Sequence, residues 1–216
     1  MHVAELWRYP VKSLGGERLE QATLLADGIE GDRLVQVVLD GRVVTSRVRP
    51  RLLGLRGTLG PGLTPQVDGV PWHDPAALAA VREATGLETV ALVADDSIER
   101  FDVLPLLVGT DGAIAHAGLD GRRFRPNIVV GGVDGLDERG WAGRMLRLGG
   151  GSAYVSVARL RPRCVMTTFD PDTQEQDRGV LRRLVEEYEG RFALDCAVTV
   201  PGTIRVGDEV ELRPAG

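Results

Sequence analysis

The sequence predicts a mainly β fold with a few helices, in the α+β class, from three observations. Short runs of β-branched and aliphatic residues recur along the 216-residue chain, and Gly, Pro and Asp residues separate them. Only two stretches combine helical periodicity with helix end signals. Hydrophobic residues make up 43% of the chain and charged residues 26%, which is the composition of a globular protein that buries a core.

The clearest predicted strand pair is a hairpin. Residues 33–39 and 42–46 flank Asp40-Gly41, and this dipeptide suits a type I′ turn, whose two central residues need positive φ. A run of glycines, Gly149-Gly150-Gly151, is interpreted as a turn between strands rather than as a phosphate-binding loop. The other predicted strands cover residues 3–8, 17–25, 89–94, 128–131, 145–148, 154–160, 192–200 and 209–213.

Two helices are predicted. The first covers residues 76–85, with Asp74 as its N-cap, Pro75 at the first helical position and Gly86 just past its end. The second covers about residues 178–189, and a glycine ends it. Its apolar side chains recur at i, i+3, i+4 and i+7, which is the spacing of one helix face: Leu181, Leu184, Val185 and Tyr188.

A boundary near residue 95, around Asp95-Asp96-Ser97, divides the chain into two β-rich halves. We predict an N-terminal domain over residues 1–95 and a C-terminal domain over residues 96–216. Within the first, the Gly- and Pro-rich residues 54–74 are expected to form a loop-rich excursion that leads to the first helix.

Charge and composition exclude several classes of protein. The net charge of −5 argues against a broad nucleic-acid-binding surface. The N-terminal residues lack the pattern of a secretory signal, and no apolar stretch is long enough to span a bilayer. Two cysteines cannot form a disulfide scaffold and favour a reducing compartment. We therefore expect a cytoplasmic protein with no nucleic-acid and no membrane partner.

Basic residues are unevenly placed. Arginines cluster at residues 122–125 and 159–163, whereas Lys12 is the single lysine of the chain. Such clusters in an acidic protein could form a local anion pocket or could be two solvated basic turns, and charge alone leaves both open. A position that remains lysine in this arginine-rich chain is a candidate for a compact ammonium group.

The two cysteines have different contexts. In Arg161-Pro162-Arg163-Cys164, neighbouring guanidinium groups favour the thiolate, which is the form that binds a metal or attacks an electrophile. The alternative is an incidental, partly exposed thiol. Cys196 alternates with apolar residues on one face of a predicted strand, so it is interpreted as a small core residue.

Five ordered segments between residues 9 and 210 carry the remaining motifs. They are Tyr9-Pro10-Val11-Lys12-Ser13; Gly31-Asp32-Arg33 with Thr45-x-Arg47-x-x-Pro50-Arg51-Leu52; Arg123-Phe124-Arg125-Pro126-Asn127-Ile128-Val129-Val130; Arg163-Cys164-x-x-Thr167-Thr168-x-Asp170-Pro171-Asp172-Thr173; and Ile204-x-Val206-Gly207-Asp208-x-Val210. Together they resemble the motifs of MOSC-domain proteins, including the MOSC N-terminal domain. Among these proteins, the chain is similar to the amidoxime-reducing components and to the C-terminal domain of molybdenum-cofactor sulfurases.

The resemblance implies a MOSC-type β-barrel with an N-terminal β-rich domain and a bound molybdenum cofactor (molybdopterin). It implies that Cys164 is both the metal ligand and the catalytic residue. The cofactor-binding residues that it implies are Lys12, Ser13, Arg33, Arg47, Arg125, Asn127, Arg163 and Thr167. A thiolate is a soft donor that suits such a metal, and cationic side chains suit a buried phosphate.

The resemblance leaves two functions open. One is a molybdenum-dependent oxidoreductase that reduces N-hydroxylated small molecules with electrons from a separate ferredoxin, flavoprotein or cytochrome. The other is a carrier that holds the cofactor, or a persulfide on Cys164, for an acceptor enzyme. Pyridoxal phosphate is not expected in this chain. A barrel that has lost its cofactor is a third reading, opposed by the intact set of binding residues.

Two departures from the family pattern affect the expected site. The segment between residues 51 and 101 looks contracted, and Gln174 stands where relatives often have glycine.

Overall fold

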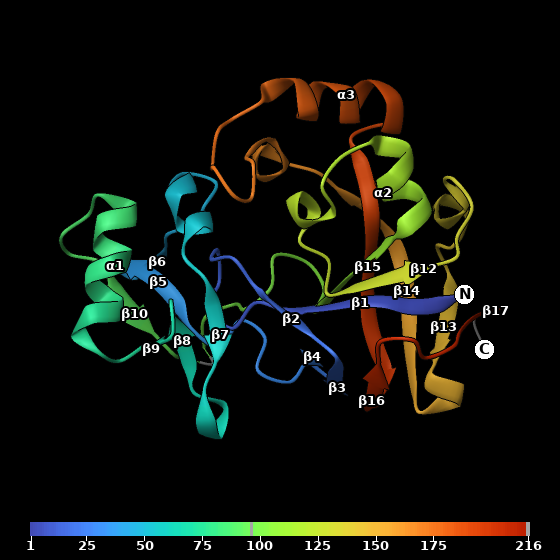
Figure 1. Cartoon of the computed structure of the whole chain (residues 1–216), viewed down its shortest axis with the longest axis horizontal. Helices are drawn as coiled ribbons and strands as arrows, with labels where there is room; N and C mark the ends of the chain where they lie inside the picture. Colours follow the sequence, from blue (N-terminus) through green and yellow to red (C-terminus); the bar gives the residue numbers. More distant parts are fainter. Residues whose placement is uncertain (96, 215–216) are drawn as a thin grey trace.

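The computed structural model describes residues 1–95 and 97–214, so Asp96 at the predicted boundary lies outside the described residues. Strands dominate the structure (Figure 1). The largest sheet has eight strands in the order β17-β13-β14-β15-β11-β12-β1-β2. Their bounds are β1 His2–Arg8, β2 Glu17–Leu19, β11 Leu106–Thr110, β12 Ile128–Gly131, β13 Arg144–Leu148, β14 Ala153–Pro162, β15 Arg191–Val200 and β17 Val210–Pro214.

Strand pairing joins the two ends of the chain. β1 pairs with β12, and β3 (Gln21–Leu25) pairs with β16 (Gly202–Arg205) and with β4 (Gly28–Ile29). One hydrophobic core therefore includes side chains from both ends, among them Val3, Leu24 and Ile204. The division of the chain at residue 95 stays a prediction, and β1 and β3, which precede it, are hydrogen-bonded to strands from beyond it.

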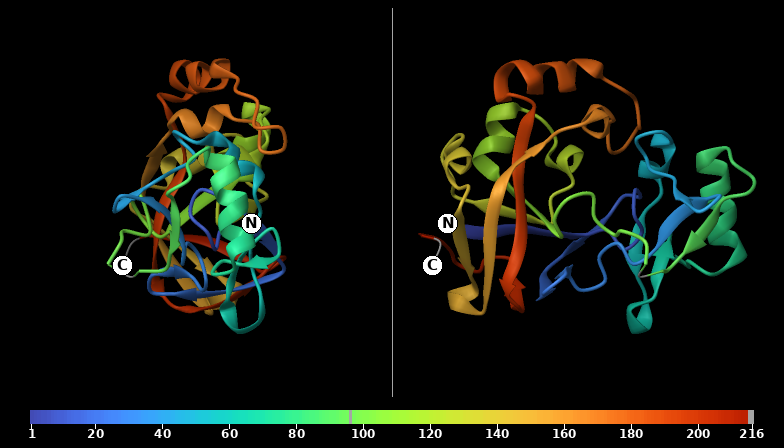
Figure 2. Two further views of the ribbon diagram at one scale, coloured as in Figure 1. Left: turned by 90° about the vertical axis from the view of Figure 1, so that its left-hand side faces the viewer. Right: turned by 180° about the vertical axis from the view of Figure 1, so that it is seen from behind.

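A second core forms around the middle of the N-terminal half. Two small sheets, of order β10-β5-β6 and β7-β8-β9, and helix α1 enclose it. Figures 1 and 2 show this group at one end of the molecule, beside the large sheet. The strand and helix bounds are β5 Gln36–Leu39, β6 Arg42–Val43, β7 Gly57–Leu59, β8 Pro65–Val67, β9 Val70–Pro71, β10 Ala91–Val93 and α1 Pro75–Thr85.

The predicted loop over residues 54–74 is wrong in part, because it contains strands β7, β8 and β9. These strands have two or three residues each, and two of them include proline. Proline is tolerated in short or edge strands, where its missing N–H is not needed by a neighbour. The pattern of glycines and prolines was therefore not evidence against a sheet.

Helix α1 confirms its predicted ends. The Asp74 carboxylate accepts a hydrogen bond from the Ala76 N–H at 2.8 Å, and Gly86 adopts the left-handed conformation at φ 65°. Helix α3 spans Arg178–Tyr188 and already ends at Glu189, which is left-handed at φ 56°. Its buried residues are Val180, Leu184 and Tyr188, whereas the predicted face residue Val185 is 56% exposed.

Helix α2 (Asp111–Ala117) was not predicted. It follows β11 directly, and the Thr110 side chain caps it by accepting a hydrogen bond from the Ala113 N–H. Together α2 and α3 cover a third apolar cluster that contains the stacked rings of Phe124 and Phe192. Short 3₁₀ helices complete the chain: η1 Pro50–Gly54, η2 Pro61–Leu63, η3 Gly121–Phe124, η4 Asp137–Gly140, η5 Gly149–Gly151 and η6 Val165–Thr168.

Two smaller predictions are confirmed. Asp40 and Gly41 both have positive φ, at 49° and 72°, as a type I′ hairpin requires. Cys196 is fully buried in the main core, and burial raises the pKa of its thiol. Within residues 1–95 and 97–214, no helix combines the length and the apolar character needed to cross a bilayer.

Candidate functional site

A cavity of about 390 Å³ lies where the two small sheets and α1 of the N-terminal half meet the large sheet. Its walls come from segments around residues 12–13, 33, 45–47, 99–107, 124–127 and 159–166. Three of these segments adjoin strands of the large sheet: residues 12–13 follow β1, residues 124–127 precede β12, and residues 159–166 include the end of β14. The sheet therefore fixes the positions of these three segments. The cavity brings together eight of the sequence-predicted site residues: Lys12, Ser13, Arg33, Arg47, Arg125, Asn127, Arg163 and Cys164.

Thr167 is the predicted site residue that the structure places elsewhere. It is fully buried behind the turn that follows Cys164. Its hydroxyl donates a hydrogen bond to the Cys164 carbonyl oxygen at 2.9 Å. Thr167 therefore shapes the cysteine turn from behind, rather than lining the cavity.

Three of the lining residues have unusual backbone conformations. Ser13, Arg33 and Arg125 have φ of 76°, 53° and 57° although none of them is glycine. The left-handed region costs a non-glycine residue about 1–3 kcal/mol, and such residues gather at functional sites. The backbone N–H of Arg33 donates a hydrogen bond to the Tyr9 carbonyl oxygen at 2.8 Å. This bond holds the turn at Arg33 against the segment that follows β1.

A buried carboxylate organises the floor. Asp32 is fully buried and accepts hydrogen bonds from the Tyr9 N–H at 2.7 Å and the Asn127 side-chain amide at 3.2 Å, and it forms an ion pair with Arg33. The amide oxygen of Asn127 accepts from the Leu107 N–H at 3.1 Å. Both ends of the Asn127 amide thus bond to the protein, where the sequence pointed to a pterin.

Two cations of the cavity, Arg125 and Arg163, have no acidic partner among the residues described. Arg125 stacks on the Tyr9 ring, with its guanidinium carbon 4.2 Å from the ring centroid. Arg163 donates one hydrogen bond, to the Phe124 carbonyl oxygen at 3.0 Å, and its buried Nε has no partner in the described parts of the chain. Burial lowers the pKa of each guanidinium to about 10. Both remain charged at neutral pH, so a bound anion would relieve their desolvation.

The other cations face acidic side chains. Asp102 lies 3.4 Å from the Lys12 ammonium and also pairs with Arg47 and Arg161. Burial alone would raise the pKa of Asp102, but Arg47 and Lys12 outweigh it, and the pKa lies below its usual value. Fully buried Asp195 accepts from Arg161 at 2.7 Å. Sequence reasoning missed both carboxylates, because each comes from a segment that no motif marked.

Cys164 lies two residues after the end of β14 and directly precedes η6, and its side chain is partly exposed. Beside it, the Ser46 hydroxyl donates to the Met166 sulfur at 3.0 Å. The cysteine therefore presents a thiol to a cavity whose charged lining groups are mostly cationic. Such an arrangement can hold an anionic ligand and supply one sulfur donor to it.

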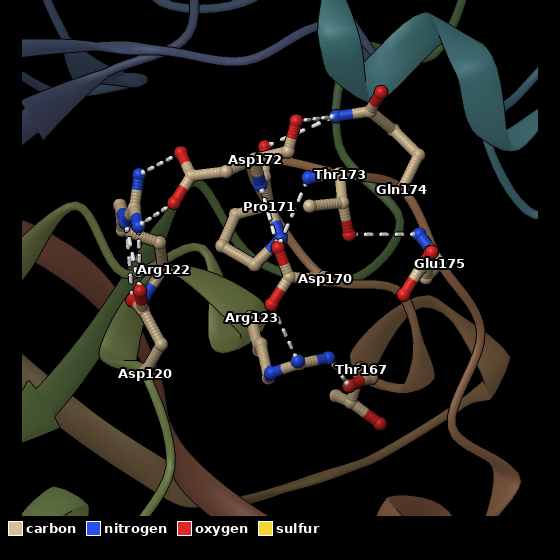
Figure 3. Close-up of polar contacts among 10 residues, drawn as sticks. All are labelled: Asp120, Arg122, Arg123, Thr167, Asp170, Pro171, Asp172, Thr173, Gln174 and Glu175. Atoms are coloured by element: carbon tan, nitrogen blue, oxygen red, sulfur yellow. Dashed lines mark hydrogen bonds and ion pairs between the residues drawn. The ribbon is translucent and has the colours of Figure 1, made fainter.

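Ion pairs tie the segment after Cys164 to η3, which carries part of the arginine cluster (Figure 3). Arg123 donates to the Asp170 carboxylate at 2.8 Å, and Arg122 bridges the carboxylates of Asp120 and Asp172. The arginine cluster at residues 122–125 is thus divided: two members hold a loop and Arg125 faces the cavity.

Gln174 closes the same loop. It adopts the left-handed conformation at φ 59°, which glycine adopts more readily than other residues. Its amide nitrogen donates to the Asp172 carbonyl oxygen at 2.8 Å, so the side chain supports a turn that glycine would make without strain.

We expect this loop to loosen in acid. The backbone N–H groups of Thr173 and Asp172 lower the pKa of Asp170 below its usual 3.8. A carboxyl group with a lowered folded-state pKa stabilises the fold above its unfolded pKa, and this stabilisation is lost as the pH falls through the folded value. The difference in free energy of unfolding between wild type and Asp170→Asn should therefore be constant near neutral pH and shrink below about pH 4.

Urea denaturation at neutral pH and at about pH 3 measures this difference. Asp40→Asn, in the exposed hairpin turn, is the matched control and should differ equally little from wild type at both pH values. A penalty for Asp170→Asn that is as large in acid as at neutral pH would contradict the assigned role.

The fold and the cavity define a class: a β-barrel protein with an N-terminal β-rich part and a basic cavity that contains one cysteine. Comparison of the sequence with models of protein families identifies this class. Residues 105–211 match the MOSC domain, and residues 1–99 match the MOSC N-terminal beta barrel domain. The chain therefore belongs to the proteins that join a MOSC N-terminal domain to a MOSC domain.

Its relatives have specific names. The chain is 27% identical to mitochondrial amidoxime reducing component 2 of Macaca fascicularis, over 96% of this chain and 82% of the relative. It is 26% identical to human mitochondrial amidoxime-reducing component 1, over 97% and 82%. The first alignment spans 279 positions against the 216 residues of this chain, so the relative contains segments that this chain lacks. The location of the contraction between residues 51 and 101 stays a prediction.

A solved structure supports the fold. The YuaD protein from Bacillus subtilis superposes with a TM-score of 0.55, at 13% identity, over 99% of this chain and 95% of that one. At this identity, the likeness concerns the fold alone.

Proposed function

We propose that the chain binds a molybdenum cofactor of the molybdopterin type in the cavity around Cys164 and reduces N-hydroxylated small molecules. One observation carries the proposal: a partly exposed thiol faces the same cavity as Arg125 and Arg163, two half-buried cations without an acidic partner in the described chain. The MOSC domain is a family of molybdenum-cofactor-binding domains, and the names of the relatives state amidoxime reduction.

The residues fit such a group. A volume of about 390 Å³ falls in the range of small-molecule sites. Arg125 and Arg163 would hold a phosphate, which would also compete with Asp102 for Lys12 and Arg47. A thiolate from Cys164 is the soft donor that a metal with sulfur ligands accepts.

When bound, the cofactor would supply transfer of two electrons to the substrate. The protein would hold and orient it: Ser13 and Arg33 through their fixed left-handed turns, and Asn127 by anchoring the floor to Asp32. Electrons would come from a separate protein of ferredoxin, flavoprotein or cytochrome type. Both cysteines are unpaired thiols, and we keep the cytoplasm as the proposed compartment.

The test is the content of molybdenum and pterin per chain, together with reduction of an amidoxime by reduced methyl viologen. Protein from a host that makes the cofactor should contain close to one of each per chain and should turn over. The matched control is the same chain from a host that cannot make the cofactor, which should do neither. Absence of metal and pterin from both preparations would refute the proposal, and a persulfide mass on the Cys164 peptide would then support the carrier function.

A further inference from the structure

A second cavity, also of about 390 Å³, lies on the other side of Arg125 and Met166, which line both cavities. It opens between η1, the β1–β2 region, η3 and the loop tied down by Asp170 and Asp172. Cys164 does not line it. The two cavities therefore share a wall and differ in chemistry.

The walls of the second cavity combine apolar and charged side chains. Trp7, Leu53, Leu55 and Phe169 line it, and Phe169 is buried. The Trp7 indole N–H donates to the Glu5 carboxylate at 2.7 Å, which fixes the plane of the ring. Apolar and aromatic walls around a few polar groups are typical of sites for small organic molecules.

The charged groups at this cavity are mostly basic. Arg122 and Arg123 are already paired with aspartates. Arg18 and Arg56 have no ion pair or side-chain hydrogen bond within residues 1–95 and 97–214 and line the same cavity. Together with Arg125, they leave an excess of guanidinium groups beside the apolar side chains of this cavity.

We propose that this second cavity binds a small organic carboxylate with an aromatic body. Guanidinium groups bind carboxylates through two parallel hydrogen bonds, and the aromatic body would pack against Trp7 and Phe169. A simple inorganic anion would gain nothing from these apolar walls. Arg18 and Arg56 line this cavity and not the Cys164 cavity, so they are available to a carboxylate whatever the Cys164 cavity holds.

Isothermal titration calorimetry with benzoate tests the proposal, with neutral benzamide and inorganic phosphate as comparison ligands. Benzoate should bind more tightly than either. The double variant Arg18→Gln/Arg56→Gln should bind benzoate at least about 10-fold more weakly. The matched control Arg49→Gln/Arg51→Gln removes two exposed arginines that do not line the cavity and should bind as wild type does.

Two further measurements locate the bound benzoate. Its addition should shift the indole N–H NMR signal that Trp7→Phe removes, while the signal of buried Trp141 should stay in place. Cys164→Ser should bind benzoate unchanged, which separates this site from the cofactor site. Equal binding of benzoate and benzamide, equal binding of benzoate and phosphate, or no heat at millimolar benzoate would each overturn the proposal.

Discussion

Cys164→Ala is expected to lower amidoxime reduction per bound molybdenum by more than about 100-fold, because loss of even an indirect partner of a metal ligand costs about 10–100-fold. Alanine removes the only thiol among the described residues that line the cavity. The rest of the cavity keeps its charges, so pterin should still be retained.

Cys196→Ala is the matched control. Cys196 is fully buried in the main core and lies outside the cavity lining. Its replacement leaves a small void and should cost about 1 kcal/mol of stability, with turnover per molybdenum unchanged. The measurement is the steady-state rate divided by the molybdenum content of each preparation. Equal rates for Cys164→Ala and wild type would remove the ligand role from Cys164.

The parts of the fold with strong local signals could be predicted from sequence. Asp74-Pro75 and Gly86 set both ends of α1, because capping depends on residues next to the helix. Alternation placed Cys196 inward, because side chains on a strand point to opposite faces. These features need no knowledge of distant residues.

The missed elements lack such signals. All five residues of β11 are buried, so it shows no alternation and does not look like a half-exposed strand. Helix α2 has seven residues, too few to show two turns of periodicity. The pairing of β3 with β16 joins residues about 180 positions apart along the chain, which no local pattern reports.

The candidate site also divides into features that the sequence could predict and features that depend on the folded structure. Motif resemblance pointed to eight residues that do line one cavity, because motifs mark positions where chemistry restricts the residue type. It did not reveal Asp102, whose carboxylate already faces Lys12 and Arg47. It also placed Thr167 with the binding residues, whereas the hydroxyl turns back to the chain. Which side chains neutralise each other depends on the folded geometry.

Arg125→Gln is expected to weaken cofactor retention about 10- to 100-fold, since a hydrogen bond to a charged group contributes about 1.5–3 kcal/mol. Arg125 is a half-buried cation with no acidic partner in the chain as described, and its desolvation lowers its pKa to about 10. The empty chain should respond differently. Loss of the contact with the Tyr9 ring and relief of desolvation oppose each other, so its unfolding free energy should change by no more than about 1 kcal/mol.

The two readouts separate a binding role from a structural one. Molybdenum and pterin remaining after extensive dialysis report retention, and urea denaturation of the empty chain reports stability. Arg51→Gln, at an exposed position outside the cavity, should change neither. If Arg125→Gln destabilised the empty chain by several kcal/mol and retained cofactor as wild type does, the guanidinium would be part of the fold and not of the anion site. The opposite pattern is what its stacking on Tyr9, without an acidic partner among the described residues, leads us to expect.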